Sequence, residues 1–236
     1  MSNSPNPYTS KDFADNWDRI QKTEDEYKNN VLLPMLFERA KISELNVKRV
    51  CELGCGNGNF ANLLLGTNIE SLYAIDISKF NLANALKNNN KDSRLKTLEF
   101  NLSQNFRENK RLFFESDFDL VVSNMVVNEL TELDNFFGLA SSILSKKGRV
   151  IISALSQEYS EFLDYPKVFN FEVENLGISI QNYCWSEEDL RSIAQQYDLN
   201  FSDRIDLQIG DKFISNNPKF HSLKNTPLVS IYTWTK

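Results

Sequence analysis

Three glycines crowd one short stretch of the chain, between an apolar run and a helix-like segment. In VCELGCGNGNF they are Gly54, Gly56 and Gly58, and Glu52 stands two residues before the first of them. Glycine permits a positive φ and lets a ligand approach the backbone without meeting a Cβ atom. A helix that begins after such a turn also offers unpaired N–H groups. We therefore interpret the stretch as a ligand-binding turn.

Two classes of ligand use such a turn, and the charges beside it distinguish them. A dinucleotide requires G-x-G-x-x-G, but Asn59 stands where the third glycine would fall. A carboxylate at Glu52 would repel a pyrophosphate, whereas it would attract the sulfonium and ammonium groups of S-adenosylmethionine. Asp76 ends the next apolar run, 20 residues after Gly56, where an acid accepts hydrogen bonds from ribose hydroxyls. Ribose is common to both ligands, so Glu52 and the glycine spacing favour S-adenosylmethionine.

Composition limits the class of protein. The chain has 236 residues, of which 41% are apolar, and a net charge of −6. No whole-chain basic field indicates nucleic-acid binding, and no apolar run is long enough to predict a membrane span. The polar start lacks the apolar core of a signal peptide, which favours the cytoplasm. Three cysteines fit a reducing compartment, and Cys51 and Cys55 lack the second ligand pair that a zinc site needs, so no metal is expected.

Strand-like and helix-like segments alternate from residue 47 onward. Such alternation is typical of parallel strands joined by helical crossovers. Ser78 and Thr131 are expected N-caps, Gly148 an expected helix stop, and Pro34 should kink or restart an N-terminal helix. Strands are expected near 47–53, 70–76, 95–101, 117–123, 148–155, 201–209 and 227–235, and helices near 58–66, 78–88, 131–146 and from Ser186 onward.

These elements predict one α/β domain over residues 1–236. Its fold class is a Rossmann-like, doubly wound seven-stranded sheet, mostly parallel with an antiparallel C-terminal strand, plus N-terminal cap helices. The alternation in PLVSIYTWTK indicates an antiparallel strand that is not fully buried. The expected parts are N-terminal helices that form a lid (1–45), a cofactor-binding core (46–155), an aromatic lid insertion without a clean period (156–185), and a C-terminal helix and strands (186–236).

Four motifs together resemble the class I S-adenosylmethionine-dependent methyltransferases. VCELGCGNGNF followed by LYAIDIS is similar to their first two motifs, and FDLVVSNMVVNEL and LSKKGRVIIS are similar to their fourth-strand and fifth-strand motifs. The likeness is closest to a small-molecule branch with a methyltransferase-11-type domain, and it covers residues 47–155 well. The resemblance implies that Gly54, Gly56 and Gly58 line the methionine and ribose of the cofactor. It also implies that Glu52 faces the amino group and Asp76 holds the ribose hydroxyls.

The same resemblance assigns the rest of the cofactor site. Ile77 would pack beside the adenine. Asn101, where the family often has an acid, would accept from the adenine amine through its amide carbonyl, and Leu102 follows it. Asn124 and Met125, at the end of the fourth strand, would lie near the methionine part and the reacting methyl.

Structural alternatives remain open at this point. Gly58 is also explained as a helix-packing glycine, Asp76 as a helix-capping acid, and Asn124 as a strand-end turn residue. The whole set is compatible with a methyltransferase fold that has lost activity.

Acceptor residues are less clearly marked. The sulfonium is already an activated methyl donor, so positioning supplies much of the rate, and no general base is obvious. His221 lies in the loop before the last strand, Asn128 stands where the family often has a histidine, and Glu129 and Glu158 follow strand ends. The residues expected to bind the acceptor are Trp17, Tyr27, Asn128, Tyr159 and His221.

The sequence thus predicts methyl transfer to an oxygen or nitrogen of a small molecule, with no nucleic acid or membrane as partner. No Asn-Pro-Pro-Tyr run follows the fourth strand, which argues against methylation of adenine or glutamine amides. The alternatives are a methyltransferase of protein or RNA, a non-catalytic binding partner, and a nucleotide-binding reductase. The oligomeric state and the catalytic residues are not predicted.

Overall fold

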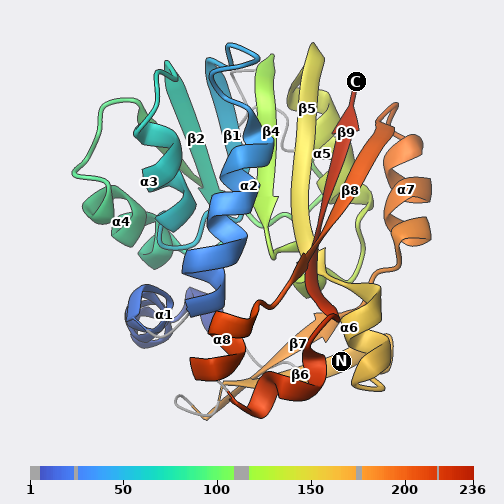
Figure 1. Ribbon diagram of the computed structural model, residues 1–236. Coiled ribbons are helices and arrows are strands. Elements are labelled where there is room, and N and C mark those ends of the chain that lie inside the picture. Colours follow the sequence, from blue (N-terminus) through green and yellow to red (C-terminus); the bar gives the residue numbers. More distant parts are fainter. Residues whose placement is uncertain (1–5, 24–25, 109–116, 174–176, 217) are drawn as a thin grey trace.

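A seven-stranded sheet with the order β3-β2-β1-β4-β5-β9-β8 forms the centre of the computed structural model (Figure 1). The structure describes residues 6–23, 26–108, 117–173, 177–216 and 218–236. Neighbouring strands from β3 to β5 are parallel, and β9 runs antiparallel to both β5 and β8. The strands are β1 (Arg49–Leu53), β2 (Ser71–Asp76), β3 (Leu95–Glu99), β4 (Phe118–Asn124), β5 (Leu144–Leu155), β8 (Asn200–Gln208) and β9 (Pro227–Thr235).

Helices cover both faces of the sheet, and the sheet separates the core into two clusters. On one face α2 and α3 pack through Leu36, Leu64 and Leu65. On the other face α5 and α7 pack through Phe136, Phe137, Leu190 and Ala194. The helices are α1 (Lys11–Thr23), α2 (Leu33–Ala40), α3 (Asn59–Leu65), α4 (Lys79–Asn88), α5 (Asp134–Ile143), α6 (Gln157–Phe162), α7 (Glu187–Gln195) and α8 (Asp211–Asn216).

The expected α/β fold is confirmed. Because the strand order reverses between β1 and β4, their carboxyl ends form the crevice in which open α/β sheets bind ligands. Ser78 caps α4 by accepting from the N–H of Asn81, and Ser186 forms a capping box with Asp189 at the start of α7. No helix in the described part of the chain is long and apolar enough to span a membrane.

The N-terminal helix α1 and the aromatic segment lie at the carboxyl ends of the strands (Figure 1). The aromatic segment contains a two-stranded hairpin of β6 (Val168–Val173) and β7 (Ile178–Tyr183), which the sequence did not predict. Phe13 of α1 and Ile180 of β7 are buried in one cluster, and Trp17 packs against it. We call α1, the preceding 3-10 turn η1 (Pro7–Thr9) and this hairpin the lid.

Three local expectations were wrong, and one was confirmed in an unexpected form. The N-cap of α5 is Leu133 rather than Thr131. Gly148 lies inside β5, where a Cβ would come 2.8 Å from the carbonyl oxygen of Phe118, so strand packing rather than a helix stop requires it. Strand β9 is antiparallel but almost wholly buried, because Val229 and Ile231 enter one core cluster while Tyr232 and Trp234 enter the other. The expectation that Pro34 kinks or restarts the N-terminal helix is met by a restart. A π-helical turn, η2 (Lys28–Leu32), interrupts the α-helical geometry, and α2 then begins with Pro34 in its first turn.

Candidate functional site

The glycine turn after β1 is held against the end of β2. The N–H groups of Gly54 and Cys55 both donate to the carbonyl of Ile75, at 2.7 and 2.9 Å. Gly54, Gly56 and Gly58 all have positive φ, at 74°, 53° and 80°. Since L-residues with a Cβ rarely adopt that region, the local sequence and the turn shape agree.

The three glycines are needed for different reasons. A Cβ at Gly54 would lie 2.2 Å from a methyl of Val126, and one at Gly58 would lie 2.9 Å from the Cα of Ala85 in α4. Both glycines therefore allow close packing of the protein on itself, which supports the packing alternative for Gly58. A Cβ at Gly56 would meet nothing within 4 Å. Gly56 thus presents open space to a ligand, and its contact with a cofactor stays a prediction.

Glu52 is a buried carboxylate without a full set of partners. Its side chain is 2% exposed, and Oε2 has no hydrogen-bond partner among the described residues. Burial raises its pKa to about 8; the charge of Asp76 acts in the same direction and that of Lys28 opposes it. An orphaned buried carboxylate is costly, and a cationic ligand would satisfy it. The residue therefore fits the ammonium of S-adenosylmethionine.

Asp76 connects the turn to the next helix. One carboxylate oxygen accepts from the N–H of Gly56 at 2.8 Å, and the other accepts from Ser78 N at 2.9 Å and Asn81 Nδ2 at 3.3 Å. Burial raises the pKa of Asp76, while these hydrogen bonds oppose that shift. A carboxylate has about four lone-pair sites, so three donors leave capacity for a ribose hydroxyl. Its helix-start role and a ligand role are thus compatible.

The end of β4 is fixed by Ser153 of the neighbouring strand. The hydroxyl of Ser153 donates to Asn124 Oδ1 at 2.7 Å, and the N–H of Met125 reaches both the hydroxyl and the carbonyl of Ser153. Met125 has a φ of 59°, which is uncommon for a residue with a long side chain. Asn124 is therefore a strand-end residue whose amide is oriented by a neighbour, and its contact with cofactor stays a prediction.

The residues expected near the adenine are spread over two environments. Ile77 keeps part of its surface accessible beside Asp76. The amide carbonyl of Asn101 accepts from the N–H of Ser103 in a local turn, and Leu102 is buried in the core. Their contacts with an adenine ring stay predictions.

Two of the residues expected to bind the acceptor make hydrogen bonds to the protein backbone. The hydroxyl of Tyr27 donates to the carbonyl of Leu207, and burial raises its pKa. Asn128 is 1% exposed, and its amide bridges the carbonyl of Tyr183 and the N–H of Leu155. Asn128 thereby joins the lid hairpin to the end of β5. These contacts assign both side chains a structural role, and contact with an acceptor stays a prediction.

The other expected acceptor residues lie in three places. Trp17 stacks on Phe13 in the lid, with ring centroids 5.6 Å apart. Tyr159 lies in α6, where its ring meets that of Tyr165 edge-on at 6.2 Å. His221 is exposed in the 3-10 turn η6 (Pro218–Leu223). The structure brings only Trp17 into the lid cluster, and the three acceptor roles stay predictions.

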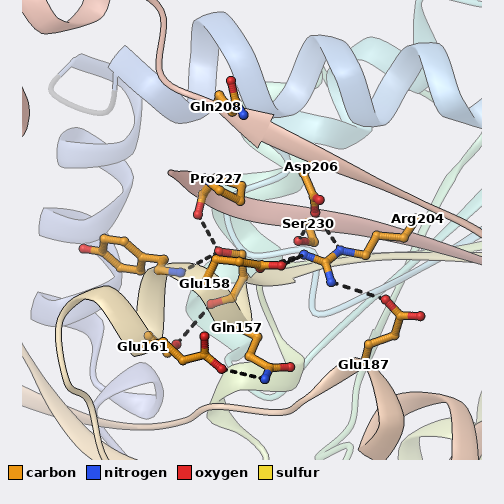
Figure 2. Close-up of polar contacts among 12 residues, drawn as sticks. Gln157, Glu158, Glu161, Glu187, Arg204, Asp206, Gln208, Pro227 and Ser230 are labelled. Carbon is orange, nitrogen blue, oxygen red and sulfur yellow. Dashed lines mark hydrogen bonds and ion pairs between the residues drawn. The ribbon is translucent and has the colours of Figure 1, made fainter. Parts of the chain in front are cut away.

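Glu158, a further carboxylate after β5, faces a different part of the molecule. Figure 2 shows it paired with Arg204 of β8, whose guanidinium also reaches Glu187 and Asp206. This ion-pair network joins α6, α7 and β8, and it accounts for Glu158 without any ligand.

Two site contacts involve the N-terminal segment and were not predicted. The hydroxyl of Tyr8 in η1 donates to Oε1 of Glu129 at 2.7 Å. Glu129 ends the 3-10 turn η4 (Val127–Glu129) that follows β4. The second contact joins Asp18 of α1 to Asn57 in the glycine turn at 2.7 Å. Sequence offered no periodic signal for either, because the partners of the first lie 121 positions apart and those of the second 39.

Metal ligands do not gather in the part of the chain that the structure describes: no three His, Cys, Asp or Glu side chains are grouped suitably. Cys51 and Cys55 are buried free thiols, and burial raises the pKa of each. A thiol with a raised pKa is a poor metal ligand because the thiolate is the ligating form.

Comparisons with known proteins agree with this geometry. A family model described as a methyltransferase domain matches residues 46–203, and no curated protein matches the sequence. The fold is similar to an S-adenosylmethionine-dependent methyltransferase from Clostridium acetobutylicum, with 18% identity, a TM-score of 0.64, and coverage of 95% of this chain and 97% of that one.

Two further solved structures show the same fold. Magnesium protoporphyrin IX methyltransferase from Synechocystis, with bound S-adenosylhomocysteine, has 14% identity and a TM-score of 0.65, covering 97% of this chain and 95% of that one. A chain from the complex of a methyltransferase with the Haloferax volcanii Trm112 activator has 16% identity and a TM-score of 0.68, covering 95% and 96%.

The fold and the site together define an enzyme of the class I methyltransferase type. The chain belongs to the methyltransferase-domain family, whose class I members use S-adenosylmethionine. The resemblance to a methyltransferase-11-type branch stays a prediction.

Proposed function

We propose that the protein transfers the methyl group of S-adenosylmethionine to an oxygen or nitrogen of a small-molecule acceptor. One observation carries the cofactor part. Glu52, whose buried carboxylate has an oxygen without a hydrogen-bond partner among the described residues, lies in β1, the strand that leads into the turn of Gly56. A Cβ added at Gly56 would meet no atom within 4 Å, so this turn has room for a ligand. S-adenosylmethionine brings a cation to Glu52 and a ribose to Asp76, whereas a dinucleotide brings Asp76 a ribose but sets a pyrophosphate against the Glu52 carboxylate.

The bound cofactor would supply an activated methyl on a sulfonium, ready for in-line displacement. The protein then has three tasks, which are to fix the cofactor, to orient the acceptor and to exclude water. Glu52 and Asp76 perform the first. The lid performs the third, because α1 and the hairpin lie at the carboxyl ends of the strands (Figure 1) and are joined by the buried cluster of Phe13 and Ile180. Positioning of this kind supplies much of the rate.

The lid favours a small acceptor over a macromolecule. Its inner cluster is aromatic and aliphatic, with Tyr8 and Trp17 beside Phe13 and Ile180. Such a cover suits a small molecule that is enclosed during reaction. The proposal also includes a cytoplasmic location, consistent with the free thiols, and it includes no nucleic acid and no membrane as partner.

A macromolecular acceptor is the second candidate, and one observation favours it. Phe162, Val168 and Phe171, on α6 and β6, are 48%, 42% and 49% exposed. Large apolar side chains left exposed are found at interaction surfaces more often than elsewhere on a protein. The similar structure with the Trm112 activator is itself a complex between two proteins.

The experiment has a cofactor arm and an acceptor arm. S-adenosylhomocysteine at 100 times its dissociation constant should stabilise the protein by about 2.7 kcal/mol. NAD should give no stabilisation, and Asp76→Ala should abolish the effect of S-adenosylhomocysteine.

For the acceptor, the protein is incubated with methyl-labelled S-adenosylmethionine and a cell extract. Label in the small-molecule fraction supports the proposal, whereas label confined to protein or RNA contradicts it.

A further inference from the structure

A third carboxylate stands at the same end of the sheet, and the cofactor does not account for it. Glu129 follows β4 in η4, and its side chain is exposed. Although accessible, it is surrounded by protein closely enough that desolvation raises its pKa to about 7.

Glu129 and the two cofactor carboxylates share one electrostatic environment. The charge of Asp76 raises the pKa of Glu129, of Tyr8 and of Glu52. Glu52 has Lys28 as an opposing charge, but Glu129 makes no ion pair among the described residues. Three acidic groups thus gather here, and one cofactor ammonium and one ribose leave Glu129 without a counterpart.

Tyr8 positions the Glu129 carboxylate and adds an aromatic wall. Its hydroxyl donates to Oε1, and Oε2 accepts no hydrogen bond from any described residue. The ring of Tyr8 meets Phe13 edge-on at 4.9 Å and Trp17 edge-on at 6.3 Å. Carboxylate and aromatic faces together are the surroundings that bind organic ammonium ions.

We propose that the acceptor is an amine, that Glu129 binds its ammonium head beside the Tyr8 and Trp17 rings, and that Glu129 then accepts the proton that the nitrogen must lose. This inference rests on the proposed function, and it narrows the oxygen or nitrogen acceptor to nitrogen. It makes Glu129 a catalytic residue and Tyr8 a positioning residue.

The transfer balances in atoms and charge. A primary ammonium first gives one proton to the Glu129 carboxylate, which exposes the nitrogen lone pair. That lone pair forms the new N–C bond while the S–C bond breaks and its electron pair stays on sulfur. The products are a neutral thioether, a methylated ammonium and a protonated Glu129, which returns its proton to water. An amine needs such a base because its ammonium form, which has a pKa of about 10, has no free lone pair.

The binding test uses amines of increasing size in the presence of saturating S-adenosylhomocysteine. Ethylamine, phenethylamine and tyramine are compared by calorimetry with 2-phenylethanol and 3-phenylpropanoate, which match phenethylamine in shape but not in charge. At least one amine should bind, and neither the alcohol nor the acid should. Glu129→Gln should weaken amine binding about tenfold or more, as expected for a lost charged partner.

Controls separate this role from others. Glu132→Gln removes an exposed carboxylate from the same loop and should leave amine binding unchanged. Tyr8→Phe keeps the ring and removes the hydroxyl, so it should weaken amine binding less than Glu129→Gln does. With a bound amine as substrate, Glu129→Gln should lower kcat/KM about 100-fold or more, as for loss of a general base.

Four results would overturn the inference. They are the absence of binding by every amine, equal binding of the alcohol or acid, amine binding that survives Glu129→Gln, and a fall in S-adenosylhomocysteine affinity in Glu129→Gln as large as the fall in amine affinity. The last would make Glu129 a cofactor residue. If the unmodified protein does not bind S-adenosylhomocysteine at all, the proposed function itself fails, and the two failures are thereby distinguished.

Discussion

Asp18 of the N-terminal helix accepts a hydrogen bond from Nδ2 of Asn57 in the glycine turn, at 2.7 Å. Asn88 of α4 strengthens the contact, since its Nδ2 donates to Asp18 at 3.0 Å and to the carbonyl of Asn57 at 2.9 Å. The lid is therefore fastened directly to the turn that we assign to the cofactor. Binding at the turn and ordering of α1 should be thermodynamically coupled.

Asp18→Ala should weaken cofactor binding although Asp18 itself need not touch the cofactor. The substitution leaves two amides without their shared acceptor, and a charged hydrogen bond contributes about 1.5–3 kcal/mol. We expect affinity for S-adenosylhomocysteine, measured by calorimetry, to fall about tenfold. Asp12→Ala, an exposed acid on the same helix, is the control. Equal affinity in both variants would show that the lid and the turn are independent.

Gly56→Ala should separate cofactor binding from folding. No atom lies within 4 Å of the added Cβ, so the expected cost is only the strain of a positive φ, about 1–2 kcal/mol. Gly54→Ala would also place its Cβ 2.2 Å from Val126 and should destabilise the fold more. Chemical denaturation measures both costs. In folded Gly56→Ala, S-adenosylhomocysteine should bind weakly, and undiminished binding would contradict our placement of the ligand.

The buried Glu52 should make the ligand-free protein less stable as the pH rises. Its folded pKa, about 8, is above the ordinary value of 4.5 because of burial. Between these two pH values the folded state holds a proton that the unfolded state releases. The stabilisation of the folded state by this proton is therefore fully present below pH 4.5 and is lost as the pH rises through 8. Urea unfolding between pH 5 and 9 should show a shallower decline in Glu52→Gln. An identical pH slope in both proteins would mean that Glu52 is not held in a desolvated state.

Arg204 should matter for stability and not for cofactor binding. Its side chain is 16% exposed and pairs with Glu158, Glu187 and Asp206 (Figure 2). Arg204→Ala leaves Glu158 and Asp206 without their cation and Glu187 with Arg191 alone, for which we expect a loss of about 1–3 kcal/mol in unfolding free energy. Arg191→Ala removes an exposed arginine that also pairs with Glu187 and should cost less. A large fall in S-adenosylhomocysteine affinity in Arg204→Ala would connect the network to the site.

Sequence periodicity predicted the sheet well, and the reasons for the misses are physical. The central strands β2, β1, β4 and β5 were found because buried parallel strands are dense apolar runs, and β9 was found from its alternation. The β6–β7 hairpin was missed because its pattern does not separate an inner and an outer face: Phe169 is buried, while Val168 and Phe171 are exposed. The burial of β9 was missed because both of its faces are covered by core clusters, which alternation along the chain does not report.

The site was predictable only where short-range spacing encodes it. Glu52, the glycines and Asp76 follow from strand ends and turn chemistry. Tyr8 and Glu129 are brought together by the path of the N-terminal segment over the sheet, 121 positions apart. The amide of Asn128 has an equally non-local role, because it bonds to backbone groups of β5 and β7. No local pattern marks such partners, since tertiary packing alone selects them.

Calorimetric titration of the protein with S-adenosylhomocysteine, repeated with Asp76→Ala and Glu52→Gln, tests the cofactor site most directly. The unmodified protein should bind one equivalent, and both variants should lose most of that affinity while remaining folded by circular dichroism. Binding that is unaffected in both folded variants, or absent from the unmodified protein, would contradict a cofactor held between these two carboxylates.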